Sequence, residues 1–350
     1  MTLKRTGLPR DFGYRMPAEW APHTATWMSW PFDEDMWFGE LQAVRTEYTA
    51  LVTTLARFEP VQLIVRDAEA RRTAAAALQG VSGVTLHEIP LDDVWMRDNG
   101  PLFVTSSRTE APLSFVKWEF NSWGEKYLWQ LDNEVPHVMG QLLNLPYFSV
   151  PVIMEGGSLD INGRGACLTT EQCLLSPKRN PHLDKSALEN LLRDYLGIEQ
   201  LVWLKLGLEG DHTDGHIDTI TRFTDERTVV TSICQDSSDV NYERMQENLD
   251  VLRSVRLGGK DPLRIIELPL PERPLYLEDG TRLPPTYANF YIANQVVVVP
   301  QYDDPADASA LAILKQVFRD REVIGLRSRA IIQGGGSFHC MTQQQPRAGV

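Results

Sequence analysis

A cysteine near the end of the printed sequence has the surroundings of a reactive thiol. Cys340 follows the three consecutive glycines 334–336 in the string GGGSFHC. A thiolate becomes a strong nucleophile where nearby cations or oriented N–H groups favour it. Glycines let the backbone approach a ligand closely, so we expect Gly335 and Gly336 to contact a substrate. The alternative is a buried cysteine after a flexible turn, but the glycine run and the polar TQQQ string beyond it favour a nucleophile.

The string GDHTDGHID places two imidazoles and two carboxylates within seven positions, at His212, Asp214, His216 and Asp218. The two histidines have the i, i+4 spacing of a zinc-binding helix, which makes a metal site one alternative. However, Gly215 interrupts such a helix, no glutamate stands between the histidines, and no second tight pair of ligands follows. A polar turn at a strand end is another alternative. The pattern favours the use of these side chains as catalytic acids and bases.

Two further loops carry carboxylates beside turns. The string WMRDNGP holds Trp95, Arg97 and Asp98 before a Gly-Pro turn, and the string EGGSLDING begins with Glu155. For either loop taken alone, a carboxylate that only caps its own turn is the simpler interpretation. The recurrence of such loops at one position of a repeated unit favours a shared site.

A thiol, an imidazole and several carboxylates in one pocket suit a particular class of substrate. Two carboxylates that face the same pocket repel each other unless a cation lies between them. A planar guanidinium fits there, because it presents paired N–H donors to each carboxylate and keeps an electrophilic carbon. A thiolate could attack that carbon, while His216 passes a proton to the departing ammonia and later activates water. The residues therefore predict hydrolysis of a guanidine C–N bond through a covalent intermediate on Cys340.

The elements that must position these loops form a weak internal repeat. Short β-branched runs flank runs with apolar residues at i, i+3 and i+4, which predicts repeated strand–helix–strand units in an α/β fold. The units span residues 61–90, 164–206, 227–270 and 294–326, with a fainter copy at 113–153. The loops after the second strands are 95–101, 155–163, 210–218 and 334–340. Units that stack radially, as in a propeller, would bring these loops together at a central point.

Composition limits the class of protein. The 350 residues include 47 acidic and 34 basic side chains, and the net charge of −13 argues against a nucleic-acid surface. The longest apolar runs have the length of strands, and the first twenty residues contain no signal-peptide core, so we expect a cytoplasmic protein without a membrane partner. Four cysteines do not form a disulfide framework, and we expect Cys167, Cys173 and Cys234 to be core thiols.

Several strings together resemble the agmatine deiminase family, within the Porphyromonas-type peptidylarginine deiminase group of the guanidine-modifying pentein superfamily. They are MPAEWAPHTATWMSWP, RFEPV, WMRDNGP, EGGSLDINGRGACLTTEQCLLSPKRNPHL, DGHID, YANFYIAN and GGGSFHCMTQQQP. The resemblance implies a single domain over residues 1–350, folded as a five-bladed α/β propeller whose pseudo-fivefold ββαβ-type repeats surround a central active site. It implies no metal and no cofactor. It also implies that agmatine and water become N-carbamoylputrescine and ammonia, and it suggests a homo-oligomer.

The resemblance assigns roles to individual residues. Cys340 corresponds to the nucleophile and His216 to the general acid/base. Asp98 and Asp218 correspond to the carboxylates that hold the guanidinium. Glu155 corresponds to an acid that completes the polar shell.

Two positions depart from the family pattern. Similar enzymes often carry an acidic residue where His212 stands and asparagine where Asp214 stands, in a loop expected near the far end of the substrate. Trp30, Trp95 and the segment 33–38 are further candidates for contact with the substrate's tail.

These departures leave other functions open. The same chemistry could act on arginine or another small guanidino compound. A Cys-dependent amidinotransferase would pass the amidine to an amine in place of water. A metal-binding or regulatory protein that uses His212, His216 and Cys340 is a third possibility.

Overall fold

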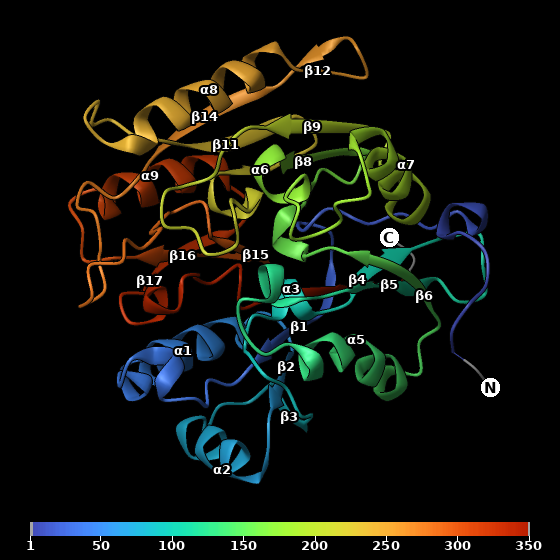
Figure 1. Ribbon diagram of the computed structural model, residues 1–350. Coiled ribbons are helices and arrows are strands. Elements are labelled where there is room, and N and C mark those ends of the chain that lie inside the picture. Colours follow the sequence, from blue (N-terminus) through green and yellow to red (C-terminus); the bar gives the residue numbers. More distant parts are fainter. Residues whose placement is uncertain (1–2, 349–350) are drawn as a thin grey trace.

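The computed structural model describes residues 3–348, whose strands form five mixed sheets of three or four strands and one two-stranded ribbon. Four of these sheets share one plan. Their middle strand pairs antiparallel with the strand before it and parallel with the strand that follows a helix. A parallel pair requires such a crossover, and the crossover helix covers the sheet. Figure 1 shows the long helices toward the outside of the molecule and the sheets further in.

The four units follow one another after residue 101. The first contains β4 (Leu102–Thr105), β5 (Leu113–Glu119), α5 (Gln130–Leu143) and β6 (Tyr147–Ile153). The second contains β7 (Asp160–Ile161), β8 (Ala166–Thr170), α7 (Lys185–Leu196) and β9 (Gln200–Leu204). The third contains β10 (Thr221–Phe223), β11 (Thr228–Ile233), α8 (Val240–Ser254) and β14 (Arg264–Pro269). The fourth contains β15 (Tyr291–Ala293), β16 (Val296–Gln301), α9 (Asp307–Val317) and β17 (Glu322–Arg327).

The fifth sheet joins the two ends of the described chain. Its strand order is β18-β1-β2-β3, with β1 (His23–Ser29), β2 (Val61–Val65), β3 (Val84–Glu88) and β18 (Gln343–Pro346). Helices α1 (Leu41–Leu55) and α2 (Ala68–Ala77) connect its parallel strands. Strand β18 pairs antiparallel with β1, with Gln343 opposite Trp27. The segment that carries Cys340 is therefore anchored three residues later by a strand of this sheet.

Short helical turns occupy the loops where the sequence places its chemistry. Four of them follow the last strand of a unit: α3 (Met96–Asn99), η3 (Gly156–Ser158), η4 (Ile217–Thr219) and η5 (Ile331–Gly334). Helix α3 contacts η3, and η3 contacts η4. The remaining short elements are η1 (Pro9–Phe12), η2 (Asp35–Trp37), α4 (Ser122–Glu125), α6 (Glu171–Leu174), β12 (Arg256–Leu257) and β13 (Asp261–Pro262).

The predicted strand–helix–strand segments are confirmed in all five copies, including the fainter one at 113–153. Their helices begin where the sequence offers a cap. Asp67, Asp184 and Asp239 each accept a hydrogen bond from a backbone N–H in the first turn of α2, α7 and α8. Between helix and sheet lie apolar cores that combine residues of the strands with residues of the helices.

The prediction for the cysteines is confirmed at two of three positions. Cys167 and Cys173 are completely buried thiols in the core of the second unit. Cys234 is only partly buried, so its assignment to the core was wrong. The reason is local: β11 ends at Ile233, and Cys234 stands where the chain leaves the sheet.

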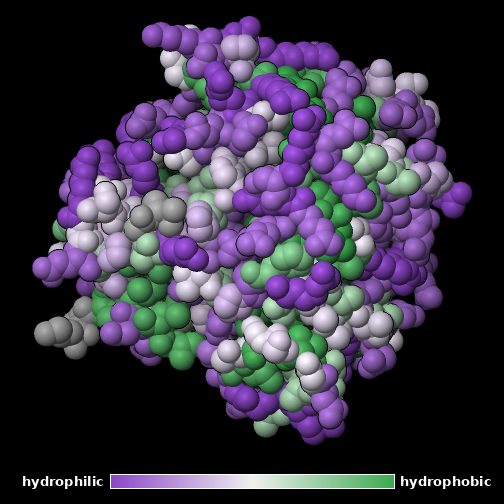
Figure 2. Space-filling view, turned by 180° about the vertical axis from the view of Figure 1, so that it is seen from behind, coloured by the Kyte–Doolittle hydropathy of each residue, from purple (hydrophilic) through white to green (hydrophobic). Residues whose placement is uncertain are grey.

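The surface of the protein is mostly hydrophilic on the face that Figure 1 hides. Figure 2 shows the face turned away in Figure 1 as mostly hydrophilic, with hydrophobic side chains in separate patches. Within residues 3–348, no helix has both the length and the apolar character needed to cross a bilayer.

Candidate active site

A cavity of about 410 Å³ lies where the loops of several units meet. Its walls come from the segment around η2, from α3, from α4 and the chain after it, from the loop before η4, and from the chain after η5. The lining residues are Asp33, Asp35, Met36, Phe38, Asp92, Asp93, Trp95, Asp98, Trp123, Tyr127, Leu128, His212, Thr213, Thr219, Gln333, Gly334, Gly335, Gly336 and Cys340. This set contains five carboxylates and, among the described residues, no lysine or arginine. The cavity is therefore suited to a cation.

Cys340 lines this cavity, and the side chains of Asn289 and Asp218 lie close to its sulfur. Asn289 donates a hydrogen bond from Nδ2 to Sγ at 3.1 Å, and Sγ lies 3.6 Å from Oδ2 of Asp218. The same asparagine accepts the backbone N–H groups of His339 and Cys340 through Oδ1, at 3.1 and 3.3 Å. Burial, together with the charges of Asp218 and Asp98, raises the pKa of the Cys340 thiol well above its usual value. These surroundings therefore favour the protonated thiol, and a cation beside the sulfur would favour the thiolate.

Asp98 projects from α3 and accepts two hydrogen bonds that fix its carboxylate. The backbone N–H of Gly157 donates to Oδ1 at 2.9 Å, and Nε1 of Trp123 donates to Oδ2 at 3.0 Å. Burial raises the pKa of Asp98 to about 6, with His216 opposing the rise and the charges of Asp218 and Glu155 adding to it. A cation placed beside this carboxylate would stabilise its ionised form and lower its pKa again.

Asp218, at η4, belongs to a chain of buried charges. Its Oδ2 lies 2.7 Å from Nδ1 of His339, whose Nε2 lies 2.7 Å from Oε2 of Glu19. Glu19 also accepts a hydrogen bond from Arg222 at 2.6 Å. Burial alone would raise the pKa of Asp218, but His339 and the cations beyond it hold that pKa below its usual range. Oδ1 of Asp218 has no hydrogen-bond partner within residues 3–348, so this buried carboxylate keeps an acceptor that a bound group could satisfy.

His216 is completely buried between the two carboxylates and the second unit. Its Nδ1 lies 3.6 Å from Oδ1 of Asp98. Burial alone would lower the pKa of His216, but Asp98, the Cys173 thiol and Glu155 together raise it well above its usual value. An imidazolium beside Asp98 can serve as a proton donor to a group bound next to that carboxylate.

The close approach of the His216 imidazole to the Asp98 carboxylate depends on Gly157. A Cβ atom at this position would lie 2.6 Å from Nδ1 of His216 and 2.8 Å from Oδ1 of Asp98. Since real Cβ contacts do not come so close, any side chain here would push the imidazole and the carboxylate apart.

Replacing Gly157 with alanine is expected to lower kcat/KM by roughly 10²-fold, the typical effect of a misplaced reacting group. Stability should fall by only about 1–3 kcal/mol, because one methyl group is added to a packed site. Steady-state kinetics and thermal melts measure both effects. Gly80→Ala is the control for activity, because no atom among the described residues lies within 4 Å of that Cβ position. Its φ of 84° means that alanine costs stability there too, but without touching the site. Near-native kcat/KM for Gly157→Ala would show that the spacing is not critical.

Glu155 and Asp214 meet on one arginine away from the cavity. Arg179 is buried and donates from Nε to Oε1 of Glu155 at 2.7 Å and from Nη1 to Oδ2 of Asp214 at 2.6 Å. Lys126 donates to Oδ1 of Asp214 at 2.8 Å and to the carbonyl of His212 at 2.6 Å. Asp214 has a left-handed backbone with φ of 64°. Asp214 therefore stabilises the conformation of its own loop through Arg179 and Lys126, and it is not among the residues that line the cavity.

The other expected contact residues divide into two groups. Trp95, His212, Gly335 and Gly336 line the cavity, as do Asp33, Asp35, Met36 and Phe38 of the segment 33–38. Trp30 is not brought to it. Its indole is buried, donates a hydrogen bond to Thr73 at 3.0 Å and packs edge-on against Tyr48.

The sequence interpretation missed four residues that support the site. Asn289 lies in the string YANFYIAN, His339 stands beside the predicted nucleophile, and Arg179 lies in the string SPKRNPHL. These strings signalled the family without assigning a role. Glu19 lies in MPAEWAP, more than 300 residues from its partner His339. Only the folded chain brings these two together.

Comparison with known proteins gives a consistent family. The model of the Porphyromonas-type peptidyl-arginine deiminase family matches residues 15–346. A protein named agmatine deiminase from Ectopseudomonas mendocina (strain ymp) is 38% identical over 97% of this chain and 98% of its own. The agmatine deiminase structure of Enterococcus faecalis superimposes with a TM-score of 0.92 at 30% identity, covering 98% of both chains. A substrate-bound agmatine deiminase of C. jejuni superimposes with a TM-score of 0.87 at 31% identity, covering 96% of this chain and 97% of that one. The chain therefore belongs to the family of Porphyromonas-type peptidyl-arginine deiminases.

Proposed function

We propose that this protein hydrolyses agmatine to N-carbamoylputrescine and ammonia through a covalent intermediate on Cys340. The observation that carries the proposal is the buried thiol 3.6 Å from Asp218, in a cavity that Asp98 also lines and that contains carboxylates but no described lysine or arginine. The full-length relatives named agmatine deiminase support the same reaction.

Asp98 and Asp218 act as the clamp for the guanidinium. Each has a carboxylate held by fixed donors, and Oδ1 of Asp218 still lacks a partner within the described chain. Guanidinium N–H groups would satisfy that acceptor and place a positive charge between the two acids. The same charge lowers the pKa of the nearby Cys340 thiol, so binding of the substrate activates the nucleophile.

The reaction then takes two steps. The Cys340 thiol releases its proton to solvent, and the thiolate attacks the guanidinium carbon to give a tetrahedral adduct. His216 gives its proton to one amino group of this adduct, the C–N bond breaks, ammonia leaves, and an S-alkyl thiouronium remains on Cys340. Neutral His216 next removes a proton from water, whose oxygen attacks the same carbon. Collapse of this adduct breaks the C–S bond, releases the ureido product and restores the thiol. Both steps use one imidazole in opposite directions, as general acid and then as general base.

The cavity favours an amine tail over an amino-acid tail. Asp33, Asp35 and Asp92 line it together with Trp95 and His212. A terminal ammonium is attracted to these carboxylates, whereas the α-carboxylate of arginine would face like charges without a described lysine or arginine in the lining. Glu155 is not among the residues that line the cavity, and its role in this proposal is to support the site through Arg179.

The family architecture supplies the frame for this site. We infer that residues 1–350 form one domain in which the five units close into a five-bladed α/β propeller around the cavity. The common plan of the units and the clustering of their final loops support this arrangement. A homo-oligomer remains a prediction that light scattering on the purified protein would test.

An ammonia-release screen tests the function. Agmatine, arginine, peptidylarginine and other guanidino compounds should be compared, with the product identified by mass. We expect agmatine to have the highest kcat/KM, together with sensitivity to a thiol alkylator and insensitivity to a chelator. A preference for arginine would reassign the substrate. Transfer of the amidine to an added amine would indicate an amidinotransferase.

The kcat/KM for agmatine is expected to fall as the pH is lowered through about 6. The clamp needs an ionised carboxylate, and burial places the pKa of Asp98 at about 6. Above this pH the carboxylate is ionised and holds the guanidinium, whereas below it the acid is protonated and the attraction is lost. A pH profile of kcat/KM measures the inflection, which should be missing from Asp98→Asn. A wild-type profile that stays flat through this range would contradict the assignment.

A further inference from the structure

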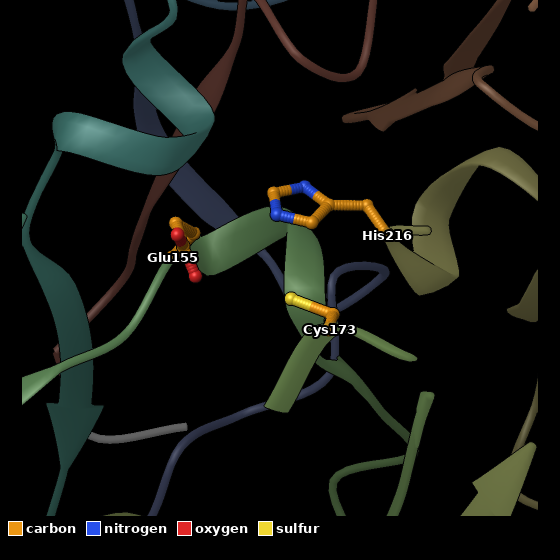
Figure 3. Close-up of side chains that lie close together, drawn as sticks. All are labelled: Glu155, Cys173 and His216. Atoms are coloured by element: carbon orange, nitrogen blue, oxygen red, sulfur yellow. The ribbon is translucent and has the colours of Figure 1, made fainter. Parts of the chain in front are cut away.

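Behind the clamp lies a second cluster of ligand-type side chains that the proposed reaction uses only in part. Glu155, Cys173 and His216 each offer an atom within 4.8 Å of the others, and they are the one such group found among the described residues. Figure 3 shows the three side chains converging from the loop before η3, from α6 and from the loop before η4. All three are completely buried.

Two of these side chains have polar atoms left without partners. Oε2 of Glu155 and both ring nitrogens of His216 have no hydrogen-bond partner within residues 3–348. With Nδ1 directed toward Asp98, Nε2 is the nitrogen that faces Glu155 and Cys173. Buried polar atoms without a partner are costly, and native proteins usually satisfy them with a protein group, water or a bound ligand.

We propose that Glu155, Cys173 and His216 form a binding site for a zinc ion, which inhibits the enzyme by occupying the imidazole that the reaction needs. The existence of the site stands on geometry alone, whereas the inhibition rests on the proposed function. A thiolate, an imidazole and a carboxylate are the ligands that zinc prefers, while magnesium and calcium favour oxygen ligands. This set differs from the His212, His216 and Cys340 combination considered for a metal-binding protein, since only His216 is shared.

Charge and size are compatible with zinc. The thiolate and the carboxylate together balance the two positive charges of the ion. Arg179 keeps its hydrogen bonds to Oε1 of Glu155 and to Asp214, so only Oε2 is needed for the metal. In a tetrahedral zinc site the ligand atoms lie about 3.3–3.8 Å apart, so the cluster must contract by about an ångström through side-chain rotation.

Zinc binding must displace protons from the Cys173 thiol and the His216 imidazolium into solvent. Binding should therefore weaken as the pH falls. An ion bound to Nε2 leaves His216 with a single proton, on Nδ1, the nitrogen beside Asp98. Donating that proton would leave an imidazolate, and a protonated Nδ1 has no lone pair with which to activate water, so His216 can perform neither step. Substrate turnover should stop without any change at Cys340 itself.

Calorimetric titration of the chelator-treated protein with zinc chloride tests the site directly. One equivalent should bind, and agmatine turnover should fall in proportion to occupancy. Cys173→Ser and Glu155→Gln should each weaken binding at least tenfold, as the loss of a ligand requires, while Cys167→Ser, a buried thiol outside the cluster, should leave it unchanged. Circular dichroism of each variant reports whether it folds.

Spectroscopy of the metal-loaded protein tests the site without an activity assay, and it does not require Cys173→Ser to fold. Cobalt in place of zinc should give a thiolate charge-transfer band, and zinc-edge X-ray absorption should find one sulfur ligand. Both signals should persist in Cys340→Ser. Their loss in Cys340→Ser, or the absence of zinc binding by the folded wild-type protein, would overturn the proposal. If the protein is inactive on every guanidino compound, the proposed function is rejected. The spectroscopic measurements still show whether zinc binds at Glu155, Cys173 and His216, because they do not depend on activity.

Discussion

Replacing Cys340 with serine is expected to abolish ammonia release from agmatine, with a loss of several orders of magnitude in kcat. A serine hydroxyl is far less acidic than a thiol, and this site already raises the pKa of the thiol through burial and the charges of Asp218 and Asp98. A guanidinium in the clamp can favour a thiolate but not an alkoxide. The variant should still bind agmatine, because the carboxylates of the clamp are unchanged. A coupled ammonia assay and calorimetric titration with agmatine measure the two quantities.

The control for this prediction is Cys167→Ser. Both cysteines are buried, but Cys167 lies in β8 and packs in the core of the second unit. It should lose some stability and keep its turnover. Circular dichroism of Cys340→Ser should match that of the wild-type protein, since the substitution removes no packing element. Turnover retained by Cys340→Ser would remove the covalent intermediate from the mechanism.

Much of the architecture could be predicted because its signals are local. Each helix is indicated by apolar residues at i, i+3 and i+4 within one segment. Each flanking strand is indicated by a short apolar run such as VVVV at 296–299. The five strand–helix–strand units therefore follow from short windows of sequence. Short glycine-rich loops at equivalent positions also pointed to the meeting of Asp98 and Cys340, which the structure brings to one cavity.

The direction of a side chain could not be predicted from spacing. Asp214 stands two residues from His216, yet the left-handed backbone at this position allows its carboxylate to reach Arg179 and Lys126. Trp30 follows β1 directly and turns into the core beneath α1 and α2, where Thr73 accepts its N–H group. In both cases the final direction depends on partners from distant segments of the chain.

The hydrogen-bond network around Cys340 and Asp218 could not be predicted from the sequence either. Asn289 holds the backbone of Cys340 and donates to its sulfur. His339 joins Asp218 to Glu19 across the whole length of the chain. A single sequence does not reveal such pairings, because nothing near either residue in the chain marks its partner. They matter because they fix the geometry that the two acids of the clamp require.

Removing either negative charge from the clamp should be nearly as damaging as removing the nucleophile. Asp98→Asn and Asp218→Asn are each expected to cost about 3–5 kcal/mol of transition-state stabilisation, the range found when one partner of a buried ion pair is lost. This corresponds to a fall in kcat/KM of about 10²–10⁴-fold. Steady-state kinetics with agmatine measures it. Asp304→Asn is the control, because that carboxylate is also buried and accepts backbone N–H groups, but it lies outside the cavity.

The two variants should differ in a way that identifies the clamp. Both oxygens of Asp98 accept from N–H donors, so an asparagine there must turn its own NH₂ group toward Gly157 or Trp123 and should also lower the melting temperature. Asparagine at 218 can keep one acceptor for His339 and place its NH₂ group where Oδ1 now lacks a partner within the described chain. Its stability should be closer to that of the wild-type protein, while its affinity for the guanidinium is lost, because an amide donor then faces the donors of the substrate. Near-native kcat/KM in either variant would mean that a cation is not held between these acids, and the activation of Cys340 by its substrate would then lose its physical cause.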